Sequence, residues 1–211
     1  LVTVIPRGVP RPPEASRRSP AELGLAEGPL AVNVGRLAPQ KGQVLLVEAF
    51  AQVIEHVPDA RLAIVGRDGE ASDQVSEAIE SFALKGSVTL VGHTSKVVDY
   101  LAAAHVFAFS SLMEGLGTAV LEAMAVGVPV VAFDIPPVRE ATADGRFATL
   151  VPVGDVAELA TALVDHLSKE KRIDTEARDW VADHHDLDRI AGQVEALLAS
   201  AAASSAPADA R

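Results

Sequence analysis

Residues 30–65 read LAVNVGRLAPQKGQVLLVEAFAQVIEHVPDARLAIV, and this stretch decides the fold class. Two short apolar runs, Leu30–Val34 and Arg61–Val65, flank a longer run whose apolar residues recur at helical spacing. The pattern predicts a strand, a helix and a second strand. Strands joined in this way through a helix pair in parallel, with a right-handed crossover.

The same alternation continues along most of the chain. We expect further strands at Ser87–Val91, His105–Phe109, Pro129–Phe133 and Phe147–Val151. We expect helices at Gly42–Val57, Ala71–Leu84, Ser95–Ala104, Gly117–Val126, Val156–Leu167, Thr175–His184 and Asp188–Ala203. The sequence therefore predicts an α/β, Rossmann-like, doubly wound parallel sheet of six strands, with the order 3-2-1-4-5-6 by analogy with similar sheets.

Composition narrows the class of protein. Hydrophobic residues make up 49% of the chain and aromatic residues only 4%, which suits a sheet covered by helices on both faces. The formal net charge of −11 argues against nucleic-acid binding. The chain has no cysteine, which excludes disulfides and thiolate sites and fits a cytoplasmic protein. No uncharged apolar stretch approaches the ~18 residues of a membrane span.

The chain divides into four parts. Residues 1–29 are rich in proline and predict an unpacked, interdomain-type linker. Residues 30–170 form the α/β domain, and residues 171–203 form C-terminal helices. Residues 204–211 predict a flexible tail. The chain begins inside a β-like run, LVTVIP, so we expect it to be a fragment or to have its front half elsewhere.

The loop after the first strand, VGRLAPQKG at residues 34–42, carries two cations between glycines. Arg36 offers a planar fork of donors and Lys41 a point charge, so together they suit the two phosphates of a diphosphate. The order Lys41-Gly42-Gln43 differs from the Gly-Lys-Ser/Thr of a P-loop. The alternative is a loop with two solvated cations.

The loop after the fourth strand is the most informative segment. It reads SSLMEGLGTAVLEAM at residues 110–124. A helix opens near Gly117, and its free N–H groups and dipole favour an anion. Thr118 and Glu122 share one face of that helix, which leaves Glu122 free to bind two sugar hydroxyls. Glu114 is expected on the other side of the phosphates. The alternative is that both acids are solvated, although Glu122 sits among apolar residues.

These segments resemble those of a known family. Glu114 and Glu122 form the Glu-x7-Glu signature of retaining glycosyltransferases with the GT-B fold, and the likeness is greatest to family 4. SSLMEGLGTAVLEAMAVGVPVVA resembles that family's site segment, and VGRLAPQKG is similar to its Gly-Arg-Leu-x3-Lys-Gly loop. Three further segments of that family are resembled by VTVIPRGV, LAIVG and VTLVGH. The similarity covers about residues 2–168 and indicates the C-terminal, donor-binding domain alone.

The resemblance implies a role for each matching residue. Arg36 and Lys41 would bind the diphosphate and neutralise the charge that grows on the leaving nucleotide, while Glu122 would bind the ribose. Glu114 would hold the donor sugar, so the catalytic residues would be Glu114, Arg36 and Lys41. The remaining binding residues would be Gly35, Gly66, Gly92, His93, Gly115, Leu116, Gly117 and Thr118. The donor would be a UDP- or GDP-sugar, and no metal or other cofactor is expected.

Several departures from the family pattern bear on activity. The acceptor domain is missing, so the chain alone is expected to be inactive or incomplete. Leu116 replaces the family's usual Phe, and Arg7 stands where Asn is common. The pair Pro136-Pro137 replaces Gly-Gly and stiffens a turn.

Other interpretations stay open. The chain could be a non-catalytic sugar-nucleotide module or part of a nucleotide-sugar epimerase. Residues 115–120 match a dinucleotide fingerprint only in part, because Val120 replaces its third glycine. Asp186-Leu187-Asp188 is a short metal-site pattern or a helix N-cap, and His184-His185 is a weak metal candidate. An apolar stripe on the last helix predicts contact with the missing acceptor domain or a partner subunit, or self-association. Its residues are Leu187, Ile190, Ala191, Val194, Leu197 and Leu198.

Overall fold

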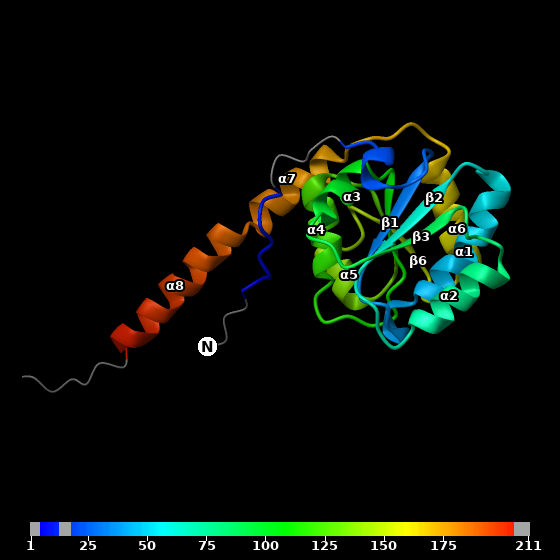
Figure 1. Ribbon diagram of the computed structural model, residues 1–211. Helices are drawn as coiled ribbons and strands as arrows, with labels where there is room; N and C mark the ends of the chain where they lie inside the picture. Colours follow the sequence, from blue (N-terminus) through cyan, green and yellow to red (C-terminus); the bar gives the residue numbers. More distant parts are fainter. Residues whose placement is uncertain (1–4, 13–17, 205–211) are drawn as a thin grey trace, which may run out of the picture.

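The computed structural model describes residues 5–12 and 18–204. Its centre is a parallel six-stranded sheet with the order β3-β2-β1-β4-β5-β6, as predicted (Figure 1). The strands are β1 (Leu30–Val34), β2 (Arg61–Val65), β3 (Val88–Gly92), β4 (Val106–Phe109), β5 (Val130–Phe133) and β6 (Thr149–Val151). Chain order reverses direction across the sheet between β1 and β4, so a crevice is expected beyond their carboxyl ends.

Helices connect and cover the strands. They are α1 (Gln43–His56), α2 (Ser72–Ser81), α3 (Val97–Ala103), α4 (Thr118–Val126), α5 (Pro136–Ala141), α6 (Val156–Leu167), α7 (Thr175–His184) and α8 (Leu187–Ser204). Two short 3-10 helices, η1 (Ala21–Leu23) and η2 (Pro39–Lys41), lie in the loops before β1 and before α1.

Alternate strand residues feed two separate cores. Val32 and Phe107 face the layer built by α3, α4 and α7, whereas Ala31 and Ala108 face the layer built by α1, α2 and α6. All four residues have less than 1% of their surface exposed. Because successive strand side chains point to opposite faces, this alternation confirms a sheet buried on both sides.

Helix α5 was not predicted from the sequence. Pro136 and Pro137 occupy its first two positions, where a missing N–H removes no helical hydrogen bond. The helix spans six residues, fewer than a helical period needs to become recognisable. The proline pair therefore starts a helix instead of only stiffening a turn.

The expectation of an unpacked linker over residues 1–29 does not hold for two of its residues. Val9 is 2% exposed and forms a parallel bridge with Asp186, and Leu25 is also buried. Tyr100 donates a hydrogen bond from its hydroxyl to the carbonyl oxygen of Leu23. Residues 1–4 and 13–17 lie outside the described residues. So does the predicted flexible tail, apart from Ser204, which ends α8.

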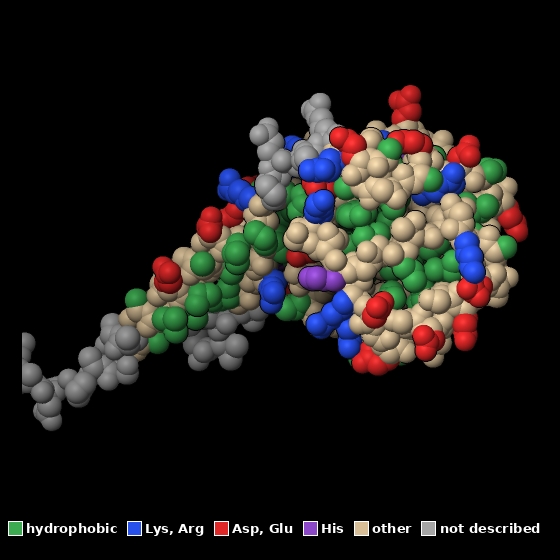
Figure 2. Space-filling view, in the orientation of Figure 1, with side chains coloured by type: hydrophobic (Ala, Val, Ile, Leu, Met, Phe, Trp, Pro, Cys, Tyr) green, Lys and Arg blue, Asp and Glu red, His purple; other side chains and the backbone are tan. Residues whose placement is uncertain are grey.

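Helix α8 projects away from the rest of the molecule (Figure 1). Hydrophobic side chains run along this arm in the space-filling view (Figure 2). Leu187, Val194, Leu197 and Leu198 are exposed on it. Within residues 5–12 and 18–204, no helix combines the length and the apolar character that crossing a bilayer requires.

Candidate functional site

A cavity of about 400 Å³ opens beyond the carboxyl ends of β1 and β4. The loops that follow these two strands build most of its wall, together with the first turns of α4. Its lining residues are Val34, Gly35, Arg36, Lys41, Phe109, Glu114, Leu116, Gly117, Thr118, Ala119 and Glu122. The two loops singled out in the sequence therefore meet at one site, at the point where the strand order reverses.

The two loops are fastened to each other by close packing. Gly42 has φ +61°, and a Cβ added there would lie only 2.2 Å from the carbonyl oxygen of Ser110. The Ser110 hydroxyl donates to the carbonyl oxygen of Lys41 at 3.0 Å. The backbone N–H of Leu112 donates to the carbonyl oxygen of Gln40 at 2.8 Å. Only glycine satisfies both the backbone angle and the space at residue 42.

Lys41 and Glu114 form an ion pair across this junction. Lys41 Nζ lies 2.5 Å from Glu114 Oε1, and the side chains are 24% and 13% exposed. Sequence reasoning did not foresee this contact, because it placed Glu114 only relative to the phosphates and Glu122. The Glu114 carboxylate neutralises Lys41, so an incoming phosphate must share the ammonium group or displace the carboxylate.

Arg36 lies at the rim of the cavity. Its Nη1 is 3.0 Å from Glu70 Oε1, and the side chain of Arg36 is 38% exposed. The pKa of Glu70 is lowered, first by a hydrogen bond to its own backbone and then by the charge of Arg36. Gln43 Nε2 donates to the carbonyl oxygen of Arg36 at 3.0 Å and so holds the loop backbone. The pair with Glu70 is solvated, so it holds the guanidinium weakly.

The N-terminus of α4 faces the cavity without a side-chain cap. Gly117 precedes the helix with φ +59°, and no side chain of the described residues accepts a hydrogen bond from its first turn. The first N–H groups of a helix have no partner within the helix, and the dipole adds partial positive charge there. Thr118 and Glu122 both line the cavity, as expected for residues on one helix face. The arrangement suits an anion beside Thr118.

Glu122 is half-buried on α4, and no described residue forms a hydrogen bond or ion pair with its carboxylate. Burial raises its pKa, and the positive charge of Arg7 opposes that rise. A half-buried carboxylate without partners is costly unless a ligand supplies donors. Arg7 comes from the N-terminal segment, so this segment also shapes the electrostatics of the cavity.

Four of the predicted site residues do not line the cavity. Gly66 lies against the loop after β1, because a Cβ added there would be 2.0 Å from the carbonyl oxygen of Gly35. Its N–H donates to the carbonyl oxygen of Gly92 at 3.0 Å. His93 and Gly115 are exposed. Gly66 and Gly92 thus support the loop from behind, and their role in ligand binding remains a prediction.

Sequence reasoning missed two buried polar residues beneath the site. Asn33 Nδ2 donates to the carbonyl oxygen of Ala108 at 2.8 Å and ties β1 to β4. Gln43 is 1% exposed, and its Oε1 has no hydrogen-bond partner among the described residues; the same holds for Asn33 Oδ1. The available signal was an amide inside an apolar strand and another at the start of an apolar helix.

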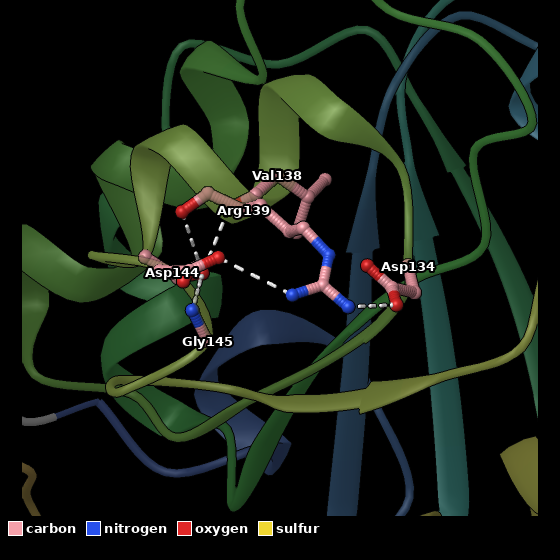
Figure 3. A network of polar contacts seen from close by, with 6 residues as sticks. Asp134, Val138, Arg139, Asp144 and Gly145 are labelled. Atoms are coloured by element: carbon pink, nitrogen blue, oxygen red, sulfur yellow. Dashed lines mark hydrogen bonds and ion pairs between the residues drawn. The ribbon is translucent and has the colours of Figure 1, made fainter.

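A polar network fixes the loop after β5, next to α4. Arg139 Nη2 lies 2.5 Å from Asp134 Oδ2, and Arg139 Nη1 lies 3.2 Å from Asp144 Oδ1 (Figure 3). These two ion pairs connect the segments at the two ends of α5. A Cβ added at Gly117 would lie 3.6 Å from the carbonyl oxygen of Pro137. The nearness of Pro137 to Gly117 places this helix beside the start of α4, at the edge of the site.

The two metal-site alternatives have other partners. Asp186 Oδ1 accepts from the N–H of Arg189 at 3.0 Å, which confirms the N-cap interpretation, and Asp186 Oδ2 pairs with Arg11 at 2.7 Å. The Nδ1 atoms of His184 and His185 contact backbone carbonyl oxygens. Among residues 5–12 and 18–204, no cluster of three or more His, Asp or Glu side chains is arranged to hold a metal ion.

Comparison with known proteins identifies similar sequences. Residues 16–187 match the family described as glycosyl transferases group 1. The chain is 32% identical over 184 residues to the GDP-mannose-dependent alpha-(1-6)-phosphatidylinositol monomannoside mannosyltransferase of Mycolicibacterium smegmatis. That match covers 82% of this chain and 48% of the relative.

Solved structures are similar in fold. Sucrose-phosphate synthase from Thermosynechococcus elongatus superposes with a TM-score of 0.84 at 28% identity, over 95% of this chain and 53% of that chain. HepE from Anabaena, solved in complex with UDP and glucose, gives 0.77 at 26% identity, over 86% and 50%. The chain thus spans about half the length of these relatives. These likenesses confirm the predicted Rossmann-like, six-stranded fold.

Proposed function

Because this chain belongs to the group 1 glycosyl transferases, we propose that its carboxyl-edge cavity binds the nucleotide-diphosphate part of a sugar donor. The observation that carries the proposal is that three features of the chain face the same cavity. Lys41, the uncapped start of α4 and the unpartnered Glu122 all face one cavity of about 400 Å³. Cationic and dipolar groups lie on one side of it, and a hydrogen-bond acceptor lies about one helical turn away.

The diphosphate occupies the space between Lys41 and the first turn of α4. Lys41 and the N–H groups near Thr118 supply positive charge there, and Arg36 reaches in from the rim once it leaves Glu70. Charge-assisted hydrogen bonds of this kind are about twice as strong as neutral ones. Together they offset the negative charge of two phosphates without requiring a metal ion.

The nucleoside lies further along α4. Glu122 accepts hydrogen bonds from two ribose hydroxyls, which satisfies a carboxylate that has no partner among the described residues. This binding favours the ionised form of Glu122, because hydroxyl donors bind a carboxylate better than a carboxylic acid.

The sugar lies near Glu114. In the transfer step the bond between the anomeric carbon and the phosphate oxygen breaks, and its electron pair leaves with the nucleotide diphosphate. Lys41, Arg36 and the α4 dipole stabilise the negative charge that grows on this leaving group. The Glu114 carboxylate, released from Lys41, stabilises the positive charge on the sugar. The oxygen of the acceptor hydroxyl then bonds to the anomeric carbon on the face that the diphosphate left, and its proton passes to the departing phosphate oxygen, so the configuration is retained.

Transfer also needs a site for the acceptor. We propose that another part of a longer protein, or a partner subunit, supplies it and contacts the apolar stripe of α8. Of the six residues of that stripe, Ile190 is buried, whereas Leu187, Val194, Leu197 and Leu198 are exposed. UDP- and GDP-sugars are both candidate donors.

Calorimetric titration with UDP, GDP and ADP tests the proposal. One nucleoside diphosphate should bind, and Lys41→Ala, Arg36→Ala and Glu122→Ala should each weaken it by about 1.5–3 kcal/mol. Lys85→Ala, which removes an exposed cation paired with Glu80, serves as the matched control. Tight binding by all three variants would overturn the site. Nucleotide binding without transfer, even after an acceptor half is added, would favour a non-catalytic module.

A further inference from the structure

A second cavity, of about 570 Å³, lies at the opposite edge of the sheet from the nucleotide cavity. Residues that precede β4 and β5, such as Ala104 and Val128, form its floor. Four cationic side chains stand around it: Arg18, Lys171, Arg172 and Arg178. No carboxylate is among the described residues that line it, although the whole chain carries a net charge of −11. We define this space as the cationic cavity.

The positive charge extends beyond one cavity. A neighbouring depression of about 170 Å³ shares Arg172 and adds Arg146, which lies 3.5 Å from Glu176. His166 also lines it, but burial and the charge of Arg172 lower its pKa and favour the neutral ring. The one acid there, Asp174, caps α7 by accepting from the N–H of Ala177 at 3.0 Å. A row of cations therefore follows the amino edge of the sheet on both sides of Arg172.

The nearby acids neutralise only part of this charge. Arg18 pairs with Asp99 at 3.2 Å, and Arg178 lies 3.4 Å from the adjacent Asp179. Neither Lys171 nor Arg172 forms an ion pair with any described carboxylate. Both side chains are exposed, so they can reach a ligand without unfolding the segment.

Only one of these cations is occupied by binding the free carbonyl groups at a helix C-terminus. Helices α3 and α4 end at this edge, and lysine side chains there commonly bind the last carbonyl groups. Lys171 does so through a hydrogen bond to the carbonyl oxygen of Ala102. Arg172 forms no such bond among the described residues, so its charge remains available.

The segment that carries Lys171 and Arg172 is held in place. The N–H of Asp174 donates to the carbonyl oxygen of Gly127 at 2.8 Å. Ile173 packs so closely that a Cβ added at Gly127 would lie 2.6 Å from its Cγ2. A site on this segment is therefore preorganised, which limits the entropy lost on binding.

We propose that the cationic cavity is a second anion site, which binds a small phosphate-bearing molecule through Lys171 and Arg172. Arginine offers a planar fork of donors and lysine a point charge, a combination that matches phosphate oxygens. Because the cationic side chains surround a hollow, a small anion can contact several of them at once. A flat membrane surface would meet only the outermost ones.

The sole tryptophan, Trp180, reports on this edge of the sheet because its ring lies 5.5 Å from that of Phe147, which lines the neighbouring depression. Its fluorescence is titrated with sodium pyrophosphate at constant ionic strength. Saturable binding should occur in the parent chain and persist in Lys41→Gln, in which the nucleotide cavity is impaired. Vesicles of phosphatidylglycerol, at the same phosphate concentration, should compete poorly.

Paired variants decide the outcome. The double variant Lys171→Gln/Arg172→Gln should weaken pyrophosphate binding by about tenfold or more. The control Lys85→Gln/Lys96→Gln removes the same amount of charge elsewhere and should change the affinity for pyrophosphate little. The exchange Lys171→Arg/Arg172→Lys should preserve most of the affinity. Loss of binding in Lys41→Gln would assign the signal to the nucleotide cavity. That result would overturn the second site. So would an equal loss of pyrophosphate affinity in the two double Gln variants, or binding of the chain to vesicles but not to pyrophosphate.

Discussion

Lys41 Nζ lies 2.5 Å from Glu114 Oε1, so the cation of one loop is neutralised by the acid of the other. Both residues line the same cavity, and both side chains are more than three-quarters withdrawn from solvent. Nucleotide binding therefore competes with an internal ion pair. This competition leads to the first prediction.

Glu114→Gln should tighten the binding of a nucleoside diphosphate that carries no sugar. The substitution frees Lys41 for the phosphates, and a hydrogen bond between charged groups contributes about 1.5–3 kcal/mol, or roughly a tenfold change in Kd or more. The same variant should lose transfer activity once an acceptor domain is present. Calorimetry measures the affinity, with Glu55→Gln on α1 as a remote control. Weaker binding of the bare nucleotide by Glu114→Gln would contradict competition.

Glu122→Gln should stabilise the folded chain at neutral pH while it weakens nucleotide binding. Burial raises the pKa of Glu122 in the folded state, so folding favours the protonated form. The contribution of Glu122 to stability is fully present below its unfolded pKa, ~4.3, and is lost as pH rises through the higher folded pKa. The Tm gain of Glu122→Gln over the parent should therefore be larger at pH 8 than at pH 4. A gain independent of pH would disprove this account.

Arg7→Met should have the opposite effect on stability. The charge of Arg7 opposes the rise in the pKa of Glu122, so its removal makes the ionised carboxylate less favourable. The Tm should fall at pH 8 and change less at pH 4. Combining Arg7→Met with Glu122→Gln should abolish that pH dependence, because no carboxylate then remains to respond. Thermal unfolding of the two single variants and the double variant gives the comparison.

Gly42→Ala should destabilise the junction between the two loops. The added Cβ would lie 2.2 Å from the carbonyl oxygen of Ser110, and φ is +61°. A shift of the backbone and a strained angle together cost about 1–3 kcal/mol. Gly86→Ala is a matched control, because a Cβ there meets no atom within 4 Å. Denaturant unfolding should show a change of under about 0.5 kcal/mol for the control.

The isolated chain should self-associate through α8. Leu197 and Leu198 are 42% and 64% exposed on a helix that projects from the body of the molecule. Contiguous exposed apolar surface of this kind drives association in water. Leu197→Glu/Leu198→Glu should shift the chain to monomer in light scattering after size-exclusion chromatography. Phe82→Glu, at an exposed apolar residue on another face of the fold, should leave the oligomer unchanged. A monomeric parent chain at high concentration would refute the prediction.

The fold was predictable because its signals are local. Strands such as Leu30–Val34 and Arg61–Val65 have the predicted bounds, since apolar runs of this length need no distant partner to be recognised. Helix α5 was missed because six residues that begin with two prolines carry no helical period. The packing of Val9 and Leu25 was missed because proline-rich segments look the same in sequence whether or not they meet a core.

The sequence by itself determined that the loops bearing Arg36, Lys41, Glu114 and Glu122 lie at one edge of a parallel sheet. In such a sheet all strands end at the same edge, and periodicity alone shows where each strand ends. Only the tertiary structure decided how the side chains meet. Lys41 pairs with Glu114, 73 residues away. Contacts like this depend on how whole helices pack and on rotamers within a few ångströms, and no local pattern of residues encodes them.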